Sequence, residues 1–365
     1  MSRMKHSAKI ALAVLAVMGL CFGFYACMTA GQPPATQSPT THSPSNWPSE
    51  TYPLPPTDHE PGLTTGELPS GSEFDHTTDH TQPVAVNPAG FPSREILRGS
   101  PDSTAGTYTG LRPLPVRPLA IADPNNSKHL PLTKVEHAYG VAKDETPHQI
   151  SIDFQNFFEA KRYAAIAYDK LTQEKVLYLT FDCGYENGNT AKILDVLKEK
   201  KVAAAFFCTV GEMEGAPEIV ARMIKEGHIV GNHSVKHPSF AEIDRTRMAQ
   251  EVLGADNYLR ENFGYSAPFF RFPKGEYNES ALEAVASLGF TSVFWSAAYA
   301  DWDTSAQKGA QYALDTVLSR IHPGAILLLH SVSQDNAEAM ADIIDGARAM
   351  GYVFRNLTEL PQLRS

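Results

Sequence analysis

The 365-residue chain contains few cysteines and has no excess of positive charge. Of its four cysteines, Cys21 and Cys27 lie among the hydrophobic first thirty residues, which leaves Cys183 and Cys208 for a folded domain. Two cysteines are too few for a scaffold held together by disulfides. The formal net charge of −10 argues against nucleic acid as a partner, because such partners require a basic surface.

The first thirty residues lack a clear processing site. Three basic residues up to Lys9 precede an uncharged run from Ile10 to Met28, which is long enough for a membrane-spanning helix with a cytoplasmic basic flank. No clean small-x-small cleavage site follows the run, and the residues before Cys27 are too bulky for a good lipobox. We predict that residues 1–30 form a membrane anchor or signal peptide. An uncleaved anchor, a lipoprotein and a cleaved signal all stay open, and each exports the rest of the chain.

Residues 31–131 lack any sustained helical or strand periodicity. They contain most of the 26 prolines, together with many serines, threonines and glycines. Such a segment cannot bury enough apolar surface to offset the entropy lost on ordering it. We therefore predict a disordered, semi-extended linker that gives an exported domain reach from the membrane.

The rest of the chain alternates strand-like and helix-like segments. Short, nearly continuous apolar runs predict strands that are buried on both faces. These runs are 176–182, 202–209, 228–233, 268–272, 291–296, 325–330 and 352–357. Helices are expected between them, at 191–201 with Thr190 as a candidate N-cap, at 217–226 with Pro217 in the first turn, and at 245–263, 280–288, 310–321 and 337–350.

This alternation predicts a parallel sheet, and we expect a distorted, incomplete (β/α)7 barrel over residues 173–365. An open doubly wound sheet is the alternative. Residues 135–172 include helical, aromatic-rich material and are expected to form an extension packed on the barrel.

Polar residues stand at the ends of the predicted strands. Asp182, His233, Arg271 and His330 each close a strand, and Asp301 follows another. Because the carboxyl ends of barrel strands share one face, we expect an active site there. Arg271 is a natural partner for a buried Asp182, with a purely structural ion pair as the alternative. Asp301 could orient His330 and raise its basicity, although His330 could also be a core histidine.

His233 and His237 are four residues apart, so a helical turn would place both imidazoles on one side. That arrangement suits a divalent metal such as zinc, but a single pair is weak evidence. Trp295 is consistent with core packing, whereas Trp302 beside Asp301 favours the lining of a pocket.

These segments resemble the motifs of a known family. They are TFDCG (180–184), HSVKH (233–237), RFPKG (271–275), WSAAYADW (295–302) and LLH (328–330). Their order and spacing are similar to those of the NodB-like polysaccharide deacetylases, carbohydrate esterase family four, over roughly residues 170–360. GYENG (184–188), VFWSAAYADW (293–302) and GAILLLHSVSQDNAEAM (324–340) resemble one branch, the delta-lactam-biosynthetic de-N-acetylases. That branch removes the acetyl group of N-acetylmuramic acid in the peptidoglycan of the spore cortex.

The resemblance implies a role for each residue. Asp182 would take a proton from water with Arg271 holding it, and His330, backed by Asp301, would protonate the departing amine. A backbone N–H near Lys274 would complete an oxyanion site. The implied metal ligands are His233 and His237, with Cys183 doubtful, and the implied substrate contacts are Tyr185, Lys274, Trp295 and Trp302. A divalent metal, zinc above all, would polarise the water and the carbonyl.

Cys183 departs from the family pattern, which has a metal-binding aspartate at this position. Three alternatives stay open. The thiolate could bind zinc, because zinc accepts soft donors. The two histidines could bind metal weakly or scarcely at all. Cys183 could also form a disulfide with Cys208, because neighbouring strands lie about 4.8 Å apart and disulfides span Cα distances of about 4.4–6.8 Å.

The resemblance therefore implies a hydrolase of amide C–N bonds that acts on peptidoglycan glycan strands outside the cytoplasm. We expect a monomer that is either anchored in the membrane through residues 1–30 or secreted to the cell wall or spore cortex. Deacetylation of N-acetylglucosamine in peptidoglycan or in another polysaccharide is one alternative function. A wall-binding module without catalysis is another.

Overall fold

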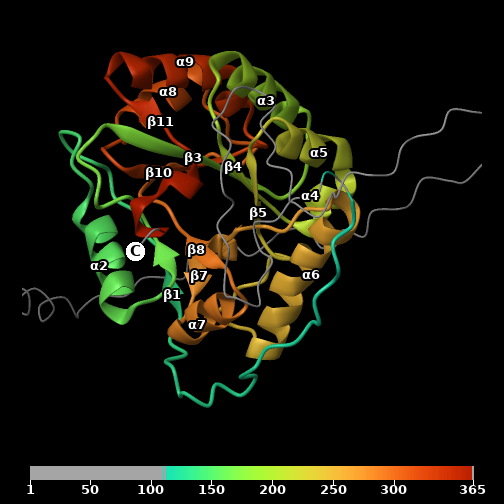
Figure 1. Cartoon of the computed structure of the whole chain (residues 1–365). Coiled ribbons are helices and arrows are strands. Elements are labelled where there is room, and N and C mark those ends of the chain that lie inside the picture. The colour runs from blue at the N-terminus through green and yellow to red at the C-terminus, as the bar shows by residue number, and fades with distance from the viewer. Residues whose placement is uncertain (1–109, 111, 364–365) are drawn as a thin grey trace, which may run out of the picture. The chain divides into compact units, whose positions relative to one another are not determined.

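The computed structural model describes residues 110 and 112–363 (Figure 1). The segment predicted as an anchor or signal peptide lies outside these residues, as does most of the predicted linker. Across the described part of the chain, no helix combines the length and the apolar character needed to cross a membrane.

A parallel sheet lies at the centre of the described region, with nine strands among these residues. In spatial order they are β2 (Ala165–Ile166), β8 (Thr291–Val293), β6 (Phe269–Phe270), β5 (Ile229–Asn232), β4 (Ala205–Cys208), β3 (Val176–Cys183), β10 (Ala325–His330) and β9 (Ala297–Ala298), while β11 (Val353–Phe354) pairs with the start of β3. All eight residues of β3 are buried, as expected for a strand covered on both faces.

The sheet curls back on itself. Strands β8 and β9 belong to a single run of chain, 291–298, which pairs with β6 through its first part and with β10 through its last part. The two ends of the strand order therefore meet in this run. Between β8 and β9 the ladder is interrupted at Phe294–Ser296, which makes the barrel incomplete, as the sequence predicted.

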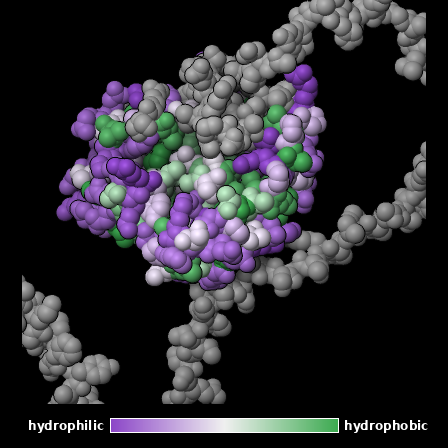
Figure 2. All heavy atoms as spheres, turned by 60° about the horizontal axis from the view of Figure 1, so that its bottom comes forward, coloured by the Kyte–Doolittle hydropathy of each residue, from purple (hydrophilic) through white to green (hydrophobic). Residues whose placement is uncertain are grey.

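Helices connect the strands and lie around the outside of the sheet (Figure 1). They are α2 (Gln149–Lys161), α3 (Asn189–Lys200), α4 (Val210–Gly215), α5 (Pro217–Lys225), α6 (Arg245–Phe263), α7 (Glu279–Ser287), α8 (Ala310–Leu318) and α9 (Gln334–Ala349). Helix α9 packs against both α3 and α8. On the face shown in Figure 2, hydrophilic residues cover most of the described surface and hydrophobic residues form smaller patches between them.

Most predicted elements are present, with some local corrections. Each predicted strand occurs, and α6 has the predicted bounds. Helix α3 begins after Gly188, which is its N-cap, so Thr190 lies inside the helix and is not its cap. Pro217 opens α5 as expected. The short strands β2 and β9 and the single-turn helix α4 have too few residues to show a hydrophobic period, and they were not predicted.

Residues 135–172 pack on the barrel in three places. Strand β1 (Val135–Glu136) pairs antiparallel with β7 (Glu276–Tyr277), and β2 adds to the edge of the sheet beside β8. Between them, α2 places Phe158 in the core.

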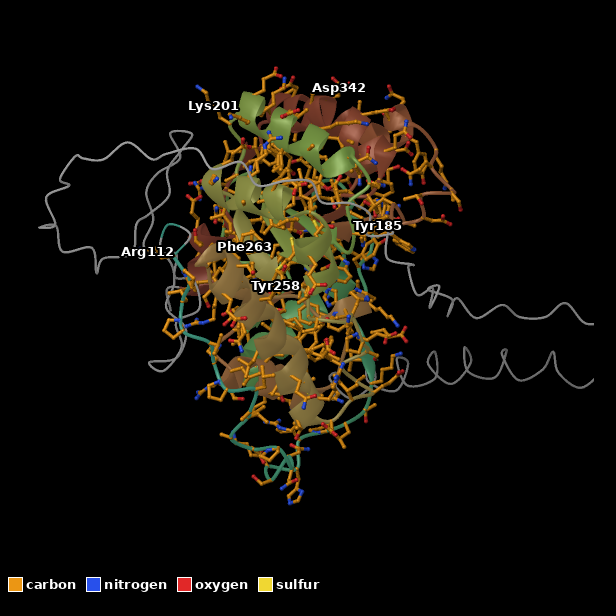
Figure 3. The ribbon with its side chains drawn as sticks, turned by 90° about the vertical axis from the view of Figure 1, so that its right-hand side faces the viewer. Arg112, Tyr185, Lys201, Tyr258, Phe263 and Asp342 are labelled. Carbon is orange, nitrogen blue, oxygen red and sulfur yellow. The ribbon has the colours of Figure 1, made fainter. Side chains whose placement is uncertain are left out.

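Residues 112–131 belong to the folded region, which corrects their assignment to the linker. The backbone of Arg117 exchanges two hydrogen bonds of 2.7 Å with the side chain of Asn257 on α6. The Arg245 Nε atom, also on α6, donates to the Asp123 carbonyl at 2.6 Å. Figure 3 shows this segment, which starts near Arg112, beside the helix that carries Tyr258 and Phe263. Polar contacts to α6 hold this segment in place, and such contacts require no hydrophobic periodicity in its sequence.

Gly231 on β5 makes room for an aromatic ring. It is the register partner of Phe207 on β4, and a Cβ atom at position 231 would lie 2.4 Å from Phe207 Cδ1. The Phe207 ring in turn lies under the guanidinium of Arg271, with 4.1 Å between Arg271 Cζ and the ring centroid. A side chain at position 231 would therefore displace the ring that supports Arg271.

We predict that Gly231→Ala lowers the free energy of unfolding by about 1–3 kcal/mol, because it over-packs the interior. Urea unfolding of the two proteins measures the difference. The control is Gly215→Ala in α4, where a Cβ atom would meet nothing within 4 Å. Equal stability of the two variants would contradict the packing described here.

Candidate active site

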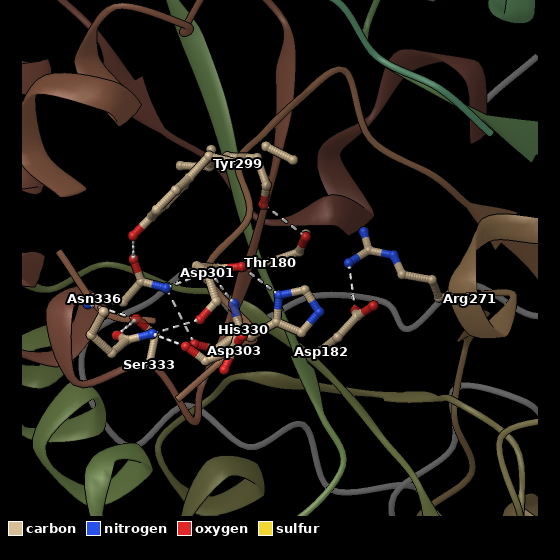
Figure 4. A network of polar contacts seen from close by, with 12 residues as sticks. Thr180, Asp182, Arg271, Tyr299, Asp301, Asp303, His330, Ser333 and Asn336 are labelled. Carbon is tan, nitrogen blue, oxygen red and sulfur yellow. Dashed lines mark hydrogen bonds and ion pairs between the residues drawn. The ribbon is translucent and has the colours of Figure 1, made fainter. Parts of the chain in front are cut away.

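Asp182 and Arg271 form a buried ion pair at the carboxyl ends of their strands (Figure 4). Asp182 lies near the end of β3, and Arg271 directly follows β6. Arg271 Nη1 donates to Asp182 Oδ1 at 2.8 Å. The arginine is fully buried, and 8% of the aspartate is exposed. The carboxylate is thus held at the rim of the barrel while the guanidinium lies inside it.

The interruption between β8 and β9 supplies the other acceptors for Arg271. Its Nε atom donates to the Val293 carbonyl at 2.9 Å, and Nη2 donates to the Phe294 carbonyl at 3.1 Å. A buried guanidinium needs such partners, because an uncompensated buried charge is expensive. All three nitrogens of Arg271 therefore have acceptors, and its orientation toward Asp182 is fixed.

The surroundings of Asp182 favour its charged form. Burial alone would raise its pKa, but the Arg271 guanidinium, together with the neighbouring His233 and His330, lowers the pKa below its ordinary value. Asp182 is therefore a carboxylate at neutral pH. Its register partner on the neighbouring strand β10 is His330, so the two side chains leave the sheet at the same level.

His330 is held by Asp301. The His330 Nδ1 atom lies 2.7 Å from Asp301 Oδ1, and the His330 backbone N–H donates to Asp301 Oδ2 at 2.8 Å. Because a carboxylate only accepts, Nδ1 carries the hydrogen and Nε2 is the atom that can gain or release a second proton. Asn336 Nδ2 on α9 also donates to Asp301 Oδ2, at 2.5 Å (Figure 4).

The pKa of His330 is raised. Burial lowers it, but the adjacent Asp301 carboxylate and the more distant Asp182 raise the pKa above its ordinary value overall. The Asp182 carboxylate, with a lowered pKa, therefore lies beside the His330 imidazole, with a raised pKa. Shifts in these two directions are the ones that would suit a base and an acid in one site.

His233 and His237 approach each other through an irregular loop, and not through the helical turn that their spacing would allow. Ser234 and His237 have left-handed φ values of 72° and 57°. Buried Glu251 on α6 accepts hydrogen bonds from the backbone of Val235 at 2.9 Å and Lys236 at 2.7 Å. These contacts replace the hydrogen bonds of a helix and fold the loop inward. The two Nε2 atoms lie 3.2 Å apart.

The histidine pair fits a divalent metal in part. Two nitrogens bound to one tetrahedral zinc would lie about 3.3 Å apart, close to the distance seen here. Burial lowers the pKa of His237 to about 3 and also lowers that of His233, so both rings are neutral, as ligands must be. His233 Nδ1 donates to the Arg271 carbonyl at 2.9 Å, which directs the Nε2 lone pair toward Asp182 Oδ2, 3.4 Å away. Still, no cluster of three His, Cys, Asp or Glu side chains among residues 110 and 112–363 could hold a metal.

Cys183 does not complete this set. It is fully buried on β3, and its register partner on β4 is Cys208. Burial and the Cys208 thiol raise the pKa of Cys183 well above its ordinary value, which disfavours the thiolate that zinc would bind. Within the described region the two cysteines are free, so the disulfide considered from the sequence is not formed.

The four residues expected to contact substrate differ in exposure. Trp302 is 53% exposed, with its ring centroid 5.9 Å from that of His330, and Tyr185 on the loop after β3 is 44% exposed (Figure 3). Lys274 is exposed and has a left-handed φ of 58°. Trp295 is buried and packs against Gly275 and His137, which is the core packing that the sequence left open.

Two positions of the site were not predicted as functional from the sequence. Asn336 lies in the first turn of α9, whose N-cap is Ser333, and it bridges Asp301 to the hydroxyl of Tyr299. Glu251 shapes the histidine loop from the middle of α6. The only sequence signal was a polar residue on an otherwise apolar helical face, and that signal does not identify a partner.

Comparison with known proteins agrees with this geometry. Residues 169–293 match the family described as polysaccharide deacetylase. The chain is 42% identical over 190 residues to the peptidoglycan-N-acetylmuramic acid deacetylase PdaA of Bacillus subtilis, covering 52% of this chain and 72% of that protein. The chain belongs to the polysaccharide deacetylase family.

The solved structure of the same enzyme and one further relative support the assignment. The solved structure of Bacillus subtilis PdaA, a family 4 carbohydrate esterase, superposes with a TM-score of 0.61 at 36% identity, covering 65% of this chain and all of that one (100%). A peptidoglycan-N-acetylglucosamine deacetylase of Bacillus cereus is 34% identical over 169 residues, covering 46% of this chain and 60% of that protein. Polysaccharide deacetylases are hydrolases that cleave acetyl amide bonds, and in general they depend on a metal.

We predict that Asp301→Asn lowers the pKa of His330. The amide removes the charge that offsets burial, so the protonated imidazole is lost at a lower pH than in the wild type. An NMR titration of the His330 ring measures the shift, with the nearby exposed Asp303→Asn as the control. An unchanged His330 pKa in Asp301→Asn would refute the assignment of Asp301 as its partner.

Proposed function

We propose that the chain removes the acetyl group from N-acetylmuramic acid in peptidoglycan, the step that leads to muramic delta-lactam in the spore cortex. The observation that carries the proposal is the pairing of Asp182 with His330 on neighbouring strand ends. One has a lowered pKa and the other a raised pKa. The higher identity to the muramic acid enzyme, 42% against 34% for the glucosamine enzyme, supports the choice of sugar.

Asp182 is the base in this proposal. Hydrolysis of an acetamide needs a water molecule that loses a proton as it attacks, and the Asp182 carboxylate is ionised at neutral pH to receive that proton. General base catalysis of this kind contributes about 10²–10⁴-fold to the rate. Arg271 prevents the carboxylate from turning away, because its guanidinium is itself fixed by two backbone carbonyls.

His330 is the acid. The departing amine needs a proton before the carbon–nitrogen bond breaks, and the raised pKa of His330 favours the imidazolium that carries this proton on Nε2. Asp301 stabilises the imidazolium and holds the ring by two contacts, at Nδ1 and at the backbone N–H. The proton gained by Asp182 and the proton given by His330 balance over one turnover.

The substrate groove is proposed to run past Trp302, Tyr185 and Lys274. Exposed aromatic rings suit the apolar faces of sugars, and a lysine suits the lactyl carboxylate of muramic acid. A backbone N–H near Lys274 supplies the oxyanion site. Trp295 supports this surface from beneath and does not contact the glycan.

His233 and His237 would hold a divalent metal, zinc above all, which would polarise the water and the acetyl carbonyl when bound. We propose that this site is weak, because among the described residues no third His, Cys, Asp or Glu side chain joins the two histidines in a cluster that could hold a metal. Catalysis then depends more heavily on the Asp182–Arg271 and His330–Asp301 pairs.

The protein is proposed to act outside the cytoplasm as a monomer on peptidoglycan glycan strands, tied to the membrane by residues 1–30. Deacetylation of N-acetylglucosamine is the second candidate, and the Bacillus cereus relative favours it. A wall-binding module without catalysis is the third. A binding module would have no use for the fixed geometry of the Asp182–Arg271 and His330–Asp301 pairs.

The test of this function uses the protein from residue 112 to residue 365 and glycan strands with and without stem peptides. We expect released acetate and de-N-acetylated muramic acid, with activity at least about 10²-fold lower in Asp182→Asn. Mass spectrometry of the digested glycan identifies the modified sugar. Deacetylation confined to glucosamine would select the second candidate, and glycan binding without acetate release would select the third.

The Cys183 position is tested by its zinc content. We predict that wild type retains little zinc on dialysis and that Cys183→Asp retains substantially more, because a carboxylate adds the hard donor that the thiol does not supply. Cys183→Ser is the matched control. A marked loss of bound zinc in the serine variant would instead identify Cys183 as a ligand.

A further inference from the structure

His137 is a buried histidine that lies outside the family motifs. It directly follows β1 in the extension before the barrel, and it is 7% exposed. Its backbone N–H donates to the Gly275 carbonyl at 2.9 Å, which continues the pairing of β1 with β7. The ring is thereby brought to the inner side of the extension, against the run that closes the barrel.

The ring is held on several sides. Its centroid lies 4.6 Å from that of Phe294 in a stacked arrangement, 4.5 Å from that of Phe154 on α2, and 4.9 Å from that of Trp295. A Cβ atom at Gly275 would lie 2.9 Å from the Trp295 ring and 3.3 Å from His137 Cβ. The imidazole is thus held in place by the pairing of β1 with β7, by the contact with α2 and by the lack of a side chain at Gly275.

One polar contact fixes the tautomer of His137. Nε2 lies 2.8 Å from the Trp295 carbonyl, and since a carbonyl only accepts, Nε2 carries the hydrogen. Among the described residues, Nδ1 has no hydrogen-bonding partner. Burial lowers the pKa of His137 to about 4, so the ring is neutral and acts as a single-hydrogen donor.

Three successive carbonyls in the interrupted run connect His137 to the ion pair. Those of Val293 and Phe294 accept from Arg271, and the next, that of Trp295, accepts from His137. The Phe294 N–H, which donates to the Ile166 carbonyl at 2.8 Å, holds the plane of the first carbonyl, and the contact from His137 holds the run at its third carbonyl. Arg271 then aims its remaining nitrogen at Asp182.

We propose that His137 is a positioning residue for the reaction: by donating to the Trp295 carbonyl, it holds the acceptors that orient Arg271 and, through Arg271, the base Asp182. The inference rests on the proposed role of Asp182. It gives the extension a part in catalysis, although no atom of His137 reaches the substrate. Plain core packing is the competing role, and it would require only the shape of the ring.

Two substitutions at position 137 separate the hydrogen-bond donor from the shape of the ring. His137→Phe keeps an aromatic ring without the donor, and His137→Gln keeps a donor near the position of Nε2 without the ring. In the full chain, we expect His137→Phe to lower kcat about tenfold with KM unchanged, because a slightly misplaced base slows the chemical step without affecting binding. His137→Gln should restore kcat to within about twofold of wild type.

Melting temperatures accompany the kinetics. If His137→Phe does not fold, His137→Leu replaces it as the variant without a donor. The control is His228→Phe, which removes another buried neutral histidine, 4% exposed, at the opposite end of its strand from the site. It should lower stability and leave kcat unchanged.

The proposal is overturned by a wild-type kcat in the folded variant that lacks the donor, His137→Phe or His137→Leu. It is also overturned by a kcat of His137→Gln as low as that of the variant that lacks the donor. A wild-type chain that releases no acetate from any glycan refutes the proposed function instead, and the inference falls with it. An active wild type with unaffected His137 variants refutes the inference alone.

Discussion

The burial of one guanidinium shapes this active site. Arg271 is enclosed in the barrel, where an uncompensated charge would cost several kcal/mol. The fold meets this cost with an aspartate, two backbone carbonyls and an aromatic ring beneath the charge. The Val293 carbonyl at the end of β8 and the Phe294 carbonyl in the interruption that follows lie where Arg271 needs acceptors. Gly231 leaves room for the Phe207 ring. The interruption that leaves the barrel incomplete therefore also allows Asp182 to be fixed and ionised.

Around this anchor the site divides into two polar systems. One joins Arg271, Asp182 and the histidine loop, and the other joins His330, Asp301 and Asn336. They meet because β3 and β10 are neighbours in register. Each system shifts its central group in the direction useful for hydrolysis, and each does so with a partner outside the reacting atoms. The proposed acid–base function therefore depends on the register of the sheet as much as on the individual side chains.

The sequence was sufficient to predict the parts that repeat or that end a strand. Buried runs such as 325–330 and the periodic helix 245–263 predicted their elements, and polar residues at strand ends predicted Asp182, Arg271 and His330 as one cluster. The shape of the histidine loop was not predicted, because it depends on Glu251, which is remote in sequence. Residues 112–131 were assigned to the linker, because hydrogen bonds to Asn257 and Arg245 leave no periodic trace. The protonated, buried state of Cys183 likewise depends on its neighbours and not on its motif.

The backbone acceptors of Arg271 have an evolutionary consequence. Every amino acid has a carbonyl group, so no replacement at positions 293 or 294 can delete the acceptor itself. Drift along that run can alter shape and packing, but it leaves the chemistry that receives the guanidinium intact. Among the hydrogen-bond acceptors of Arg271 described above, only the Asp182 carboxylate can be removed by a single codon change. Inactivation by point mutation should therefore concentrate at the ion pair and leave the run that encloses it free to vary.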